Sequence, residues 1–206
     1  MPIVLGLLLY AAPGYAFEIS TSSTGAELRR LDGPWLGAVA ESTTASVAQA
    51  IRFAFDSWAQ RAQLDLQWVG VVAPESADNV DAVALADPWD PAFGDPQLAL
   101  AFAEVRFDPT SGVIRSTDVY LNAENFRFAP GAFDVQSVVL HELGHGRGFA
   151  HTCGDRGTTF PSCFSVPPAE AERVLSAVMA PALSVAEQKR ILTPDDRMGL
   201  VQHYGR

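Results

Sequence analysis

Apolar residues recur at helical spacing between positions 44 and 62. Polar residues such as Gln49, Arg52 and Asp56 occupy the positions between them. On a helix with 3.6 residues per turn, this pattern places the apolar side chains on one face. We therefore predict an amphipathic helix over residues 44–62, whose start Thr43 or Thr44 can cap. Its buried face consists of Val47, Ile51, Phe55 and Trp58.

Other stretches have the pattern of β-strands. Residues 64–69 alternate between apolar and polar, as a half-buried strand does. Residues 98–107 and 116–122 are two further predicted strands, joined through a turn that contains Asp108, Pro109 and Gly112. Residues 17–20 could form a first strand or belong to an extended arm.

Two more helices are indicated by residues that favour a helix start. Pro130-Gly131 breaks the chain before a helix that Asp134 can cap and whose buried face begins with apolar residues. Thr193-Pro194-Asp195-Asp196 supplies a cap, a proline at the first helical position and two acids in the first turn. We predict a C-terminal helix from there. The apolar residues after Asp134 are Val135, Val138 and Val139.

Two segments are predicted to be irregular. Residues 73–97 contain four prolines and five aspartates, and form the least regular part of the chain. This segment could bind calcium through its carboxylates or could be a solvated acidic loop, and it lacks the ligand spacing of an EF-hand. Residues 152–176 form a long insertion that Pro161, Pro167 and Pro168 interrupt.

Length and charge restrict the class of protein. A chain of 206 residues with 48% hydrophobic residues can form one domain with a sizeable core. The formal net charge of −10 argues against nucleic acid as a partner, because phosphates select basic surfaces.

The first 16 residues are apolar and uncharged, and they end in Gly14-Tyr15-Ala16. Gly14 and Ala16 put small residues at the −3 and −1 positions of a cut before Phe17, which is typical of a secretory signal peptide. We predict a signal peptide over residues 1–16, although no Lys or Arg precedes its apolar run. The run is too short for a membrane span, which needs about 20 apolar residues. We therefore expect a secreted protein, extracellular or periplasmic, with no membrane span.

Cys153 and Cys163 are the two cysteines of the chain. In an exported protein, a pair at this spacing favours a disulfide. The alternatives are two free thiols, or a thiolate that competes for a metal ion.

Three of the four histidines lie in the stretch His141–His151, which reads H-E-L-G-H-G-R-G-F-A-H. His141 and His145 are four residues apart, so a helix places them one turn apart on the same face. Gly148 can end the helix, because glycine readily adopts the left-handed conformation. The chain can then turn and bring His151 back as a third ligand. Three nitrogen ligands with an open fourth position are typical of a catalytic zinc site, whereas a structural site has a fourth protein ligand. The alternative, a helix with surface histidines, does not account for the five fixed positions of the pattern.

This stretch resembles the extended zinc signature H-E-x-x-H-x-x-G-x-x-H of the metzincin metallopeptidases. The resemblance is greatest to bacterial secreted enzymes of the matrixin type. It also rests on Leu98-Ala99-Leu100-Ala101-Phe102, on Asp118-Val119-Tyr120-Leu121-Asn122 and on the C-terminal helix. The family has a methionine on a tight turn beneath the metal. Met179, in Ala177-Val178-Met179-Ala180-Pro181, fits that role, and ordinary core packing is the alternative.

The resemblance implies an α+β fold in a single catalytic domain over residues 17–206. Such a domain has a twisted mixed β-sheet with an active-site helix, a backing helix and a C-terminal helix. The resemblance further implies one catalytic zinc ion held by His141, His145 and His151, with Glu142 as general base for peptide-bond hydrolysis. We expect a monomer that binds a protein or peptide substrate.

In this family an edge strand lines the cleft and pairs with an extended substrate, and here its residues would be Ala99, Leu100, Ala101 and Phe102. An internal strand without a binding role is the alternative. The pocket for the side chain at the cleaved bond has walls from the active-site helix and from the segment after Met179. Two other functions stay open: a catalytically silent, zinc-stabilised binding protein, and a zinc hydrolase of cell-wall peptides.

Overall fold

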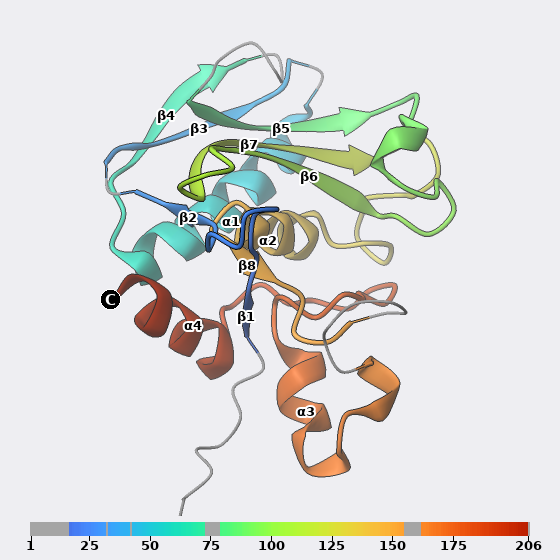
Figure 1. Ribbon diagram of the computed structural model, residues 1–206. Coiled ribbons are helices and arrows are strands. Elements are labelled where there is room, and N and C mark those ends of the chain that lie inside the picture. Colours follow the sequence, from blue (N-terminus) through green and yellow to red (C-terminus); the bar gives the residue numbers. More distant parts are fainter. Residues whose placement is uncertain (1–16, 32, 42, 73–78, 155–161, 206) are drawn as a thin grey trace, which may run out of the picture.

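The computed structural model describes residues 17–31, 33–41, 43–72, 79–154 and 162–205, and within them it has a mixed α+β architecture (Figure 1). A mostly parallel β-sheet lies on one side of helices α1 (Ala45–Ala62) and α2 (Val135–His145). Helices α3 (Pro168–Ser176) and α4 (Pro194–Tyr204) lie beyond them, away from the sheet (Figure 1). The predicted α+β class is thus confirmed, while the predicted signal peptide lies outside the described residues.

The large sheet has the strand order β2-β7-β5-β3-β4, and β6 also pairs with β7. Every pairing in it is parallel except the antiparallel pair of β6 and β7. Within the described chain, β6 pairs with β7 alone, so it is an edge strand. In chain order the strands are β2 (Arg29–Arg30), β3 (Trp35–Val39), β4 (Leu66–Val71), β5 (Val80–Ala86), β6 (Ala101–Phe107) and β7 (Val113–Asn122).

Strands β3 and β5 at the centre of the sheet were not predicted. The expectation that residues 73–97 are irregular is wrong for β5. Both strands are almost entirely buried, and a strand covered on both faces has a continuous apolar run instead of an alternating one. The short run Val80–Ala86 is further disguised by Asp81, whose buried carboxylate pairs with Arg30.

The predicted strand over residues 98–107 begins three residues late, at Ala101. Asp95 holds the preceding segment in a turn: its backbone oxygen accepts hydrogen bonds from the amides of Leu98 and Ala99, at 3.0 and 2.9 Å. Its side chain accepts another from the amide of Gln97 at 2.9 Å. These amides are therefore not available to a strand.

Helices α1 and α2 pack against each other over the core. The indole of Trp58 on α1 donates a hydrogen bond of 2.8 Å to the carbonyl of Leu140 on α2. Asp134 caps α2 as predicted, accepting from the amide of Ser137 at 2.9 Å. Thr44 occupies the N-cap position of α1 without a side-chain cap hydrogen bond, so the expected threonine cap is wrong in that respect.

The C-terminal helix was predicted and α3 was not. Thr193 and Asp196 form a capping box at the start of α4, with Pro194 at the first helical position. In the segment predicted as an insertion, Pro168 occupies a first-turn position of α3, where the missing N–H costs nothing. Pro167 and Pro168, which were interpreted as an interruption, therefore mark the start of a helix.

The short strands β1 (Glu18–Ile19) and β8 (Phe149–Ala150) form a separate antiparallel pair. Two short 3₁₀ helices complete the described structure, η1 (Pro91–Phe93) and η2 (Cys163–Ser165). Among the described residues, no helix combines the length and apolarity needed to cross a membrane.

Asp81 on β5 connects three other strands of the sheet in the interior, namely β2, β3 and β7. Its carboxylate pairs with the Arg30 guanidinium and accepts hydrogen bonds from the Trp35 indole at 2.7 Å and the Thr117 amide at 2.8 Å. Its exposed fraction is 1%, so water cannot replace these partners. We predict that Asp81→Ala lowers the free energy of unfolding by about 3–5 kcal/mol, because it leaves a buried cation uncompensated.

Urea unfolding followed by circular dichroism measures this loss. Asp65→Ala is the control, because Asp65 is exposed and its side chain bonds an exposed glutamine. Equal stability of the two variants would contradict the assigned role of Asp81.

Candidate metal centre

Helix α2 places two imidazoles one turn apart and fixes their ring orientation. Nδ1 of His141 lies 2.7 Å from the carbonyl oxygen of Val178, and Nδ1 of His145 lies 2.8 Å from that of Phe149. Because a carbonyl only accepts, each Nδ1 must carry the proton and donate it. The Nε2 lone pair of each ring is then available to a metal ion, which is the usual arrangement of metal-binding histidines.

The turn after α2 returns the chain towards these rings. The helix ends at His145 with Gly146 at the C-cap, so the expectation that Gly148 ends it is two residues late. Gly148 instead makes the turn, with φ +84, and a Cβ there would overlap the carbonyl oxygen of Leu28. From Gly148 the chain enters β8, whose pairing with β1 leads directly to His151.

The three predicted ligands converge. Nε2 of His141 and Nε2 of His151 lie 3.1 Å apart, and one ring nitrogen from each of the three histidines lies within 4.8 Å of the others. Two nitrogens on a tetrahedral zinc ion, at bond lengths near 2.1 Å, stand about 3.4 Å apart. Among the described residues, this is the one group of three or more His, Cys, Asp or Glu side chains that could hold a metal ion.

The charge state of these histidines suits a metal. Burial lowers the pKa of His145 to about 4, and it lowers the pKa of His141 well below its ordinary value of 6.5. Burial also lowers the pKa of His151. All three rings are therefore neutral near pH 7, which is the form that binds metal ions.

Glu142 is buried beside this group, with an exposed fraction of 8%. Burial raises the pKa of its carboxyl group to about 8. A carboxylate in such a place is ionised at neutral pH only when a positive charge lies near it. A cation held by the three histidines would supply that charge. The three histidines and the buried Glu142 are therefore both compatible with a bound metal ion.

Met179 lies on a turn against α2, as expected. The amide of Ala180 bonds the carbonyl of Ala177 at 3.2 Å, which closes the turn, and Met179 is 1% exposed. Its sulfur occupies the space where a side chain at Gly144 would lie. Gly144, between His141 and His145, therefore lets the turn approach closely enough for Val178 to orient His141. A glycine inside a helix is the one sign of this contact in the sequence.

A cavity of about 390 Å³ lies beside the histidines. His141, Glu142 and His151 line it, together with the segment 180–183 that follows Met179. Ser137 and Lys189 also line it, and no sequence pattern marked these two residues. The apolar part of the wall includes Phe126, Phe133, Val138 and Leu183.

Three of the four predicted substrate-strand residues reach this cavity, namely Ala99, Leu100 and Ala101. Phe102, also in β6, does not line the cavity. Successive side chains of a strand point to opposite faces, and Phe102 stacks on Phe93 with ring centroids 4.8 Å apart. It belongs to a small aromatic cluster with Trp89 and Tyr120.

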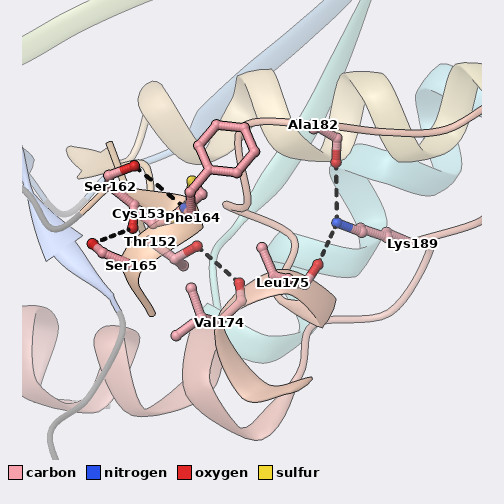
Figure 2. Close-up of a disulfide and its surroundings, with 10 residues drawn as sticks. Thr152, Cys153, Ser162, Phe164, Ser165, Val174, Leu175, Ala182 and Lys189 are labelled. Carbon is pink, nitrogen blue, oxygen red and sulfur yellow. Dashed lines mark hydrogen bonds between the residues drawn. A yellow bond between two sulfur atoms is a disulfide. The ribbon is translucent and has the colours of Figure 1, made fainter. Parts of the chain in front are cut away.

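Cys153 and Cys163 form the predicted disulfide, with Cα atoms 5.0 Å apart (Figure 2). The disulfide packs against Val174 of α3. The cysteines are thus not available as metal ligands. Thr152, next to His151, donates hydrogen bonds to the carbonyls of Val174 at 2.9 Å and Met179 at 3.0 Å. The segment after the third histidine is therefore tied to both α3 and the methionine turn.

Of the two alternatives for residues 73–97, calcium binding gains no support from the described part of the segment. Asp81 is paired with Arg30, and Asp90 and Asp95 each bond a backbone amide two residues ahead. Asp78 lies outside the described residues. The fourth histidine is also accounted for, since Nε2 of His203 lies 2.8 Å from the carbonyl oxygen of Leu28.

The fold and the site together define an α+β protein with a three-histidine group that could hold a metal ion. No model of a known protein family matches the chain, and no curated protein matches it either. Its function therefore has to be inferred from the site.

We predict that purified protein binds one zinc ion and that His151→Ala loses it. A site with two imidazoles retains much weaker affinity, because the ion loses a ligand that the fold holds in place. Zinc content after dialysis, measured by mass spectrometry of the metal, tests this. His203→Gln is the matched control, since it removes the one histidine outside the group, and it should keep the ion.

We also predict that Gly144→Ala destabilises the protein by about 1–3 kcal/mol, because the added methyl group displaces the Met179 sulfur. Thermal unfolding and zinc content are the measurements. Combining Gly144→Ala with Met179→Ala should cost less than the sum of the two single changes, because the second change makes room for the first. Strict additivity would show that the two residues do not press on each other.

Proposed function

We propose that this protein is a zinc-dependent endopeptidase of the matrixin type among the metzincins. The single observation that carries the proposal is the placement of Glu142. Its carboxylate lines the same cavity as two of the three convergent histidines, His141 and His151. A group that only stabilised the fold would have no need of a buried acid beside an open cavity.

The arrangement of elements supports the more specific fold assignment. An antiparallel edge strand, β6, borders an otherwise parallel sheet. Helix α2 carries two histidines and the acid, α1 backs it, and α4 closes the chain. The methionine turn lies against α2 at Gly144. These are the parts that the sequence resemblance implies for a metzincin-type domain.

His141, His145 and His151 would hold the metal ion. A zinc ion in such a site supplies Lewis acidity and lowers the pKa of a water molecule to roughly 7. Neutral imidazoles suit zinc, although they also bind copper, nickel and iron, so the identity of the metal is part of the proposal. The carbonyls of Val178 and Phe149 keep the rings in the orientation that binding needs.

Glu142 would act as the general base and then as the general acid. Its carboxylate accepts a proton from the attacking water and delivers it to the amine nitrogen that leaves. Burial keeps bulk water away from the carboxyl group, so the proton stays within the site.

The substrate would lie along the edge of β6. An unpaired strand edge accepts an extended peptide through backbone hydrogen bonds. The segment from Ala99 to Ala101 and the segment 180–183 both line the cavity that contains Glu142. A side chain next to the cleaved bond would enter this cavity. Export through a signal peptide over residues 1–16 agrees with the disulfide, which persists in oxidising compartments.

We predict that Glu142→Ala lowers the rate of casein cleavage by about 10²–10⁴-fold, because the proton transfer loses its positioned group. The zinc content of the variant should equal that of the wild type, since the ligands are intact. Fluorescent casein and metal analysis of both zinc-replete proteins are the measurements.

Glu124→Ala is the control, because Glu124 lies outside the histidine cavity and its carboxylate caps the amide of Trp89. Cleavage by both Glu142→Ala and the wild type at equal rates would contradict the role of the acid. If the wild type holds one zinc ion yet cleaves neither casein nor a mixed peptide library, the silent binding protein is favoured. Cleavage restricted to cell-wall crosslink peptides would favour the hydrolase alternative.

A further inference from the structure

The cavity beside Glu142 contains one cationic side chain, among the described residues that line it. Lys189 is the only lysine of the 206 residues, whereas the chain carries 13 arginines. The lining histidines His141 and His151 would be committed to the metal ion. Lys189 is therefore the residue of the lining whose own side chain can attract an acidic group of a substrate.

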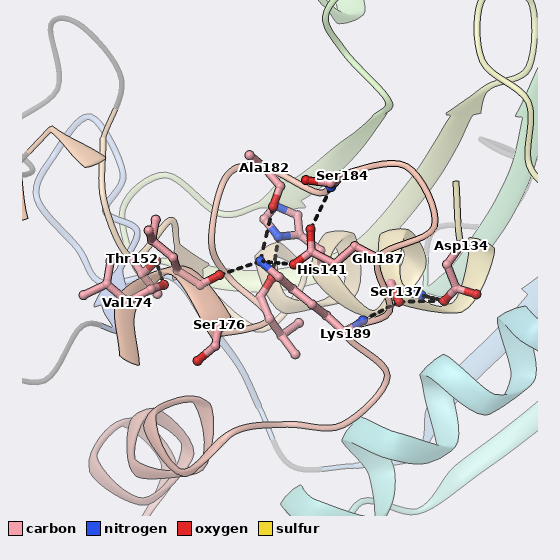
Figure 3. Close-up of polar contacts among 12 residues, drawn as sticks. Asp134, Ser137, His141, Thr152, Val174, Ser176, Ala182, Ser184, Glu187 and Lys189 are labelled. Atoms are coloured by element: carbon pink, nitrogen blue, oxygen red, sulfur yellow. Dashed lines mark hydrogen bonds and ion pairs between the residues drawn. The ribbon is translucent and has the colours of Figure 1, made fainter. Parts of the chain in front are cut away.

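The fold holds this side chain firmly in place (Figure 3). The backbone amide of Lys189 donates to the Ser137 hydroxyl of α2 at 2.8 Å. Its Nζ donates to the carbonyl of Leu175 at 2.7 Å and to that of Ala182 at 3.2 Å. Lys189 thus joins α2, the end of α3 and the wall segment, and its side chain is only 9% exposed.

Lys189 forms an ion pair with the partly exposed carboxylate of Glu187, and the other groups that its Nζ contacts are uncharged carbonyls. Two carbonyls take two of its three N–H groups, and a carbonyl carries no net charge. The carboxylate of Glu187 lies 3.7 Å from Nζ, which is beyond hydrogen-bond distance, and it also accepts from the amide of Ser184 at 2.7 Å. Glu187 is 38% exposed at its side chain, so solvent weakens its attraction for the ammonium group.

We propose that Lys189 selects substrates with an acidic side chain next to the cleaved bond. This inference rests on the endopeptidase function proposed above. The walls formed by Leu183, Val138 and Phe133 accommodate the methylene groups of a glutamate. Its carboxylate then approaches Nζ of Lys189 in competition with Glu187, and forms a charge-assisted hydrogen bond in a site shielded from water. A lysine or arginine side chain in the same position is repelled.

Peptide cleavage tests this selection in two steps. A peptide library first locates the cleaved bonds by mass spectrometry, and Asp and Glu should be enriched at one of the two positions beside them. Matched peptides with Glu, Gln, Leu or Lys at that position then give kcat/KM. We expect the Glu peptide to exceed its Gln counterpart by about tenfold, the ratio expected when a charged hydrogen bond replaces a neutral one. The Lys peptide should be the poorest substrate.

Variants separate the charge of Lys189 from its role in holding the wall. Lys189→Met should abolish the preference for Glu over Gln, and Lys189→Arg should retain a preference. Glu187→Gln keeps an acceptor for the Ser184 amide but removes the competing charge, so it should raise the preference. Arg190→Met is the matched control, because Arg190 is the next residue, pairs with Asp134 and does not line the cavity. A purely structural lysine would lower all rates together and leave the Glu/Gln ratio unchanged, which would overturn the proposal.

A second measurement does not depend on catalysis. Because the chain has one lysine, protein labelled with ¹³C-lysine gives a single Cε resonance. In the Glu142→Ala variant, that resonance should shift when the Glu peptide is added and should shift much less with the Gln peptide. An unchanged resonance, while calorimetry records binding of the Glu peptide, overturns the selection by Lys189. Absence of cleavage by the wild type on every peptide overturns the endopeptidase function instead, so the two failures are distinguishable.

Discussion

The orientation of two half-buried imidazoles by backbone carbonyls is the interaction on which the rest of this site depends. A carbonyl at Nδ1 fixes which nitrogen carries the proton, and so it directs the other lone pair of His141 and His145 into the site. One of these carbonyls belongs to the methionine turn and the other to β8. The helix alone would leave both rings free to rotate. Two segments far apart in the sequence must therefore reach α2 before the three nitrogens can converge.

Glycine makes that approach feasible. At Gly144 the absence of a side chain admits the sulfur of Met179, and at Gly148 it admits the carbonyl of Leu28. The first contact brings the methionine turn to His141, and the second secures the turn that returns the chain to His151. Both glycines lie inside the histidine stretch. The same short segment therefore supplies the ligands and the space that lets them converge. A larger residue at either place would separate the ligands without removing any of them.

The local patterns of the sequence predicted most of the helices and the whole histidine group, because each depends on residues close together in the chain. The two central strands of the sheet were missed because their burial depends on segments far away in the sequence. Strands β3 and β5 are buried on both faces, so they lack the alternation that identifies a half-exposed strand. The side chain of Phe102 lies away from the cavity because successive side chains of a strand point to opposite faces, and this depends on the strand start at Ala101. Lys189 was missed because it belongs to no motif, and only the tertiary fold brings it to the cavity.

The charges of this protein would act on an acidic substrate in opposite directions at long and at short range. The formal charge of −10 repels such a substrate from afar, but at physiological ionic strength the interaction is screened beyond about 8 Å. Lys189 lies within the cavity at 9% exposure, where counterions and water reach it poorly. In the proposed endopeptidase, Lys189 would therefore attract an acidic side chain at short range, where the acids of the surface are screened. The proposed preference depends on the few charges that the fold buries, and net charge is a poor guide to it.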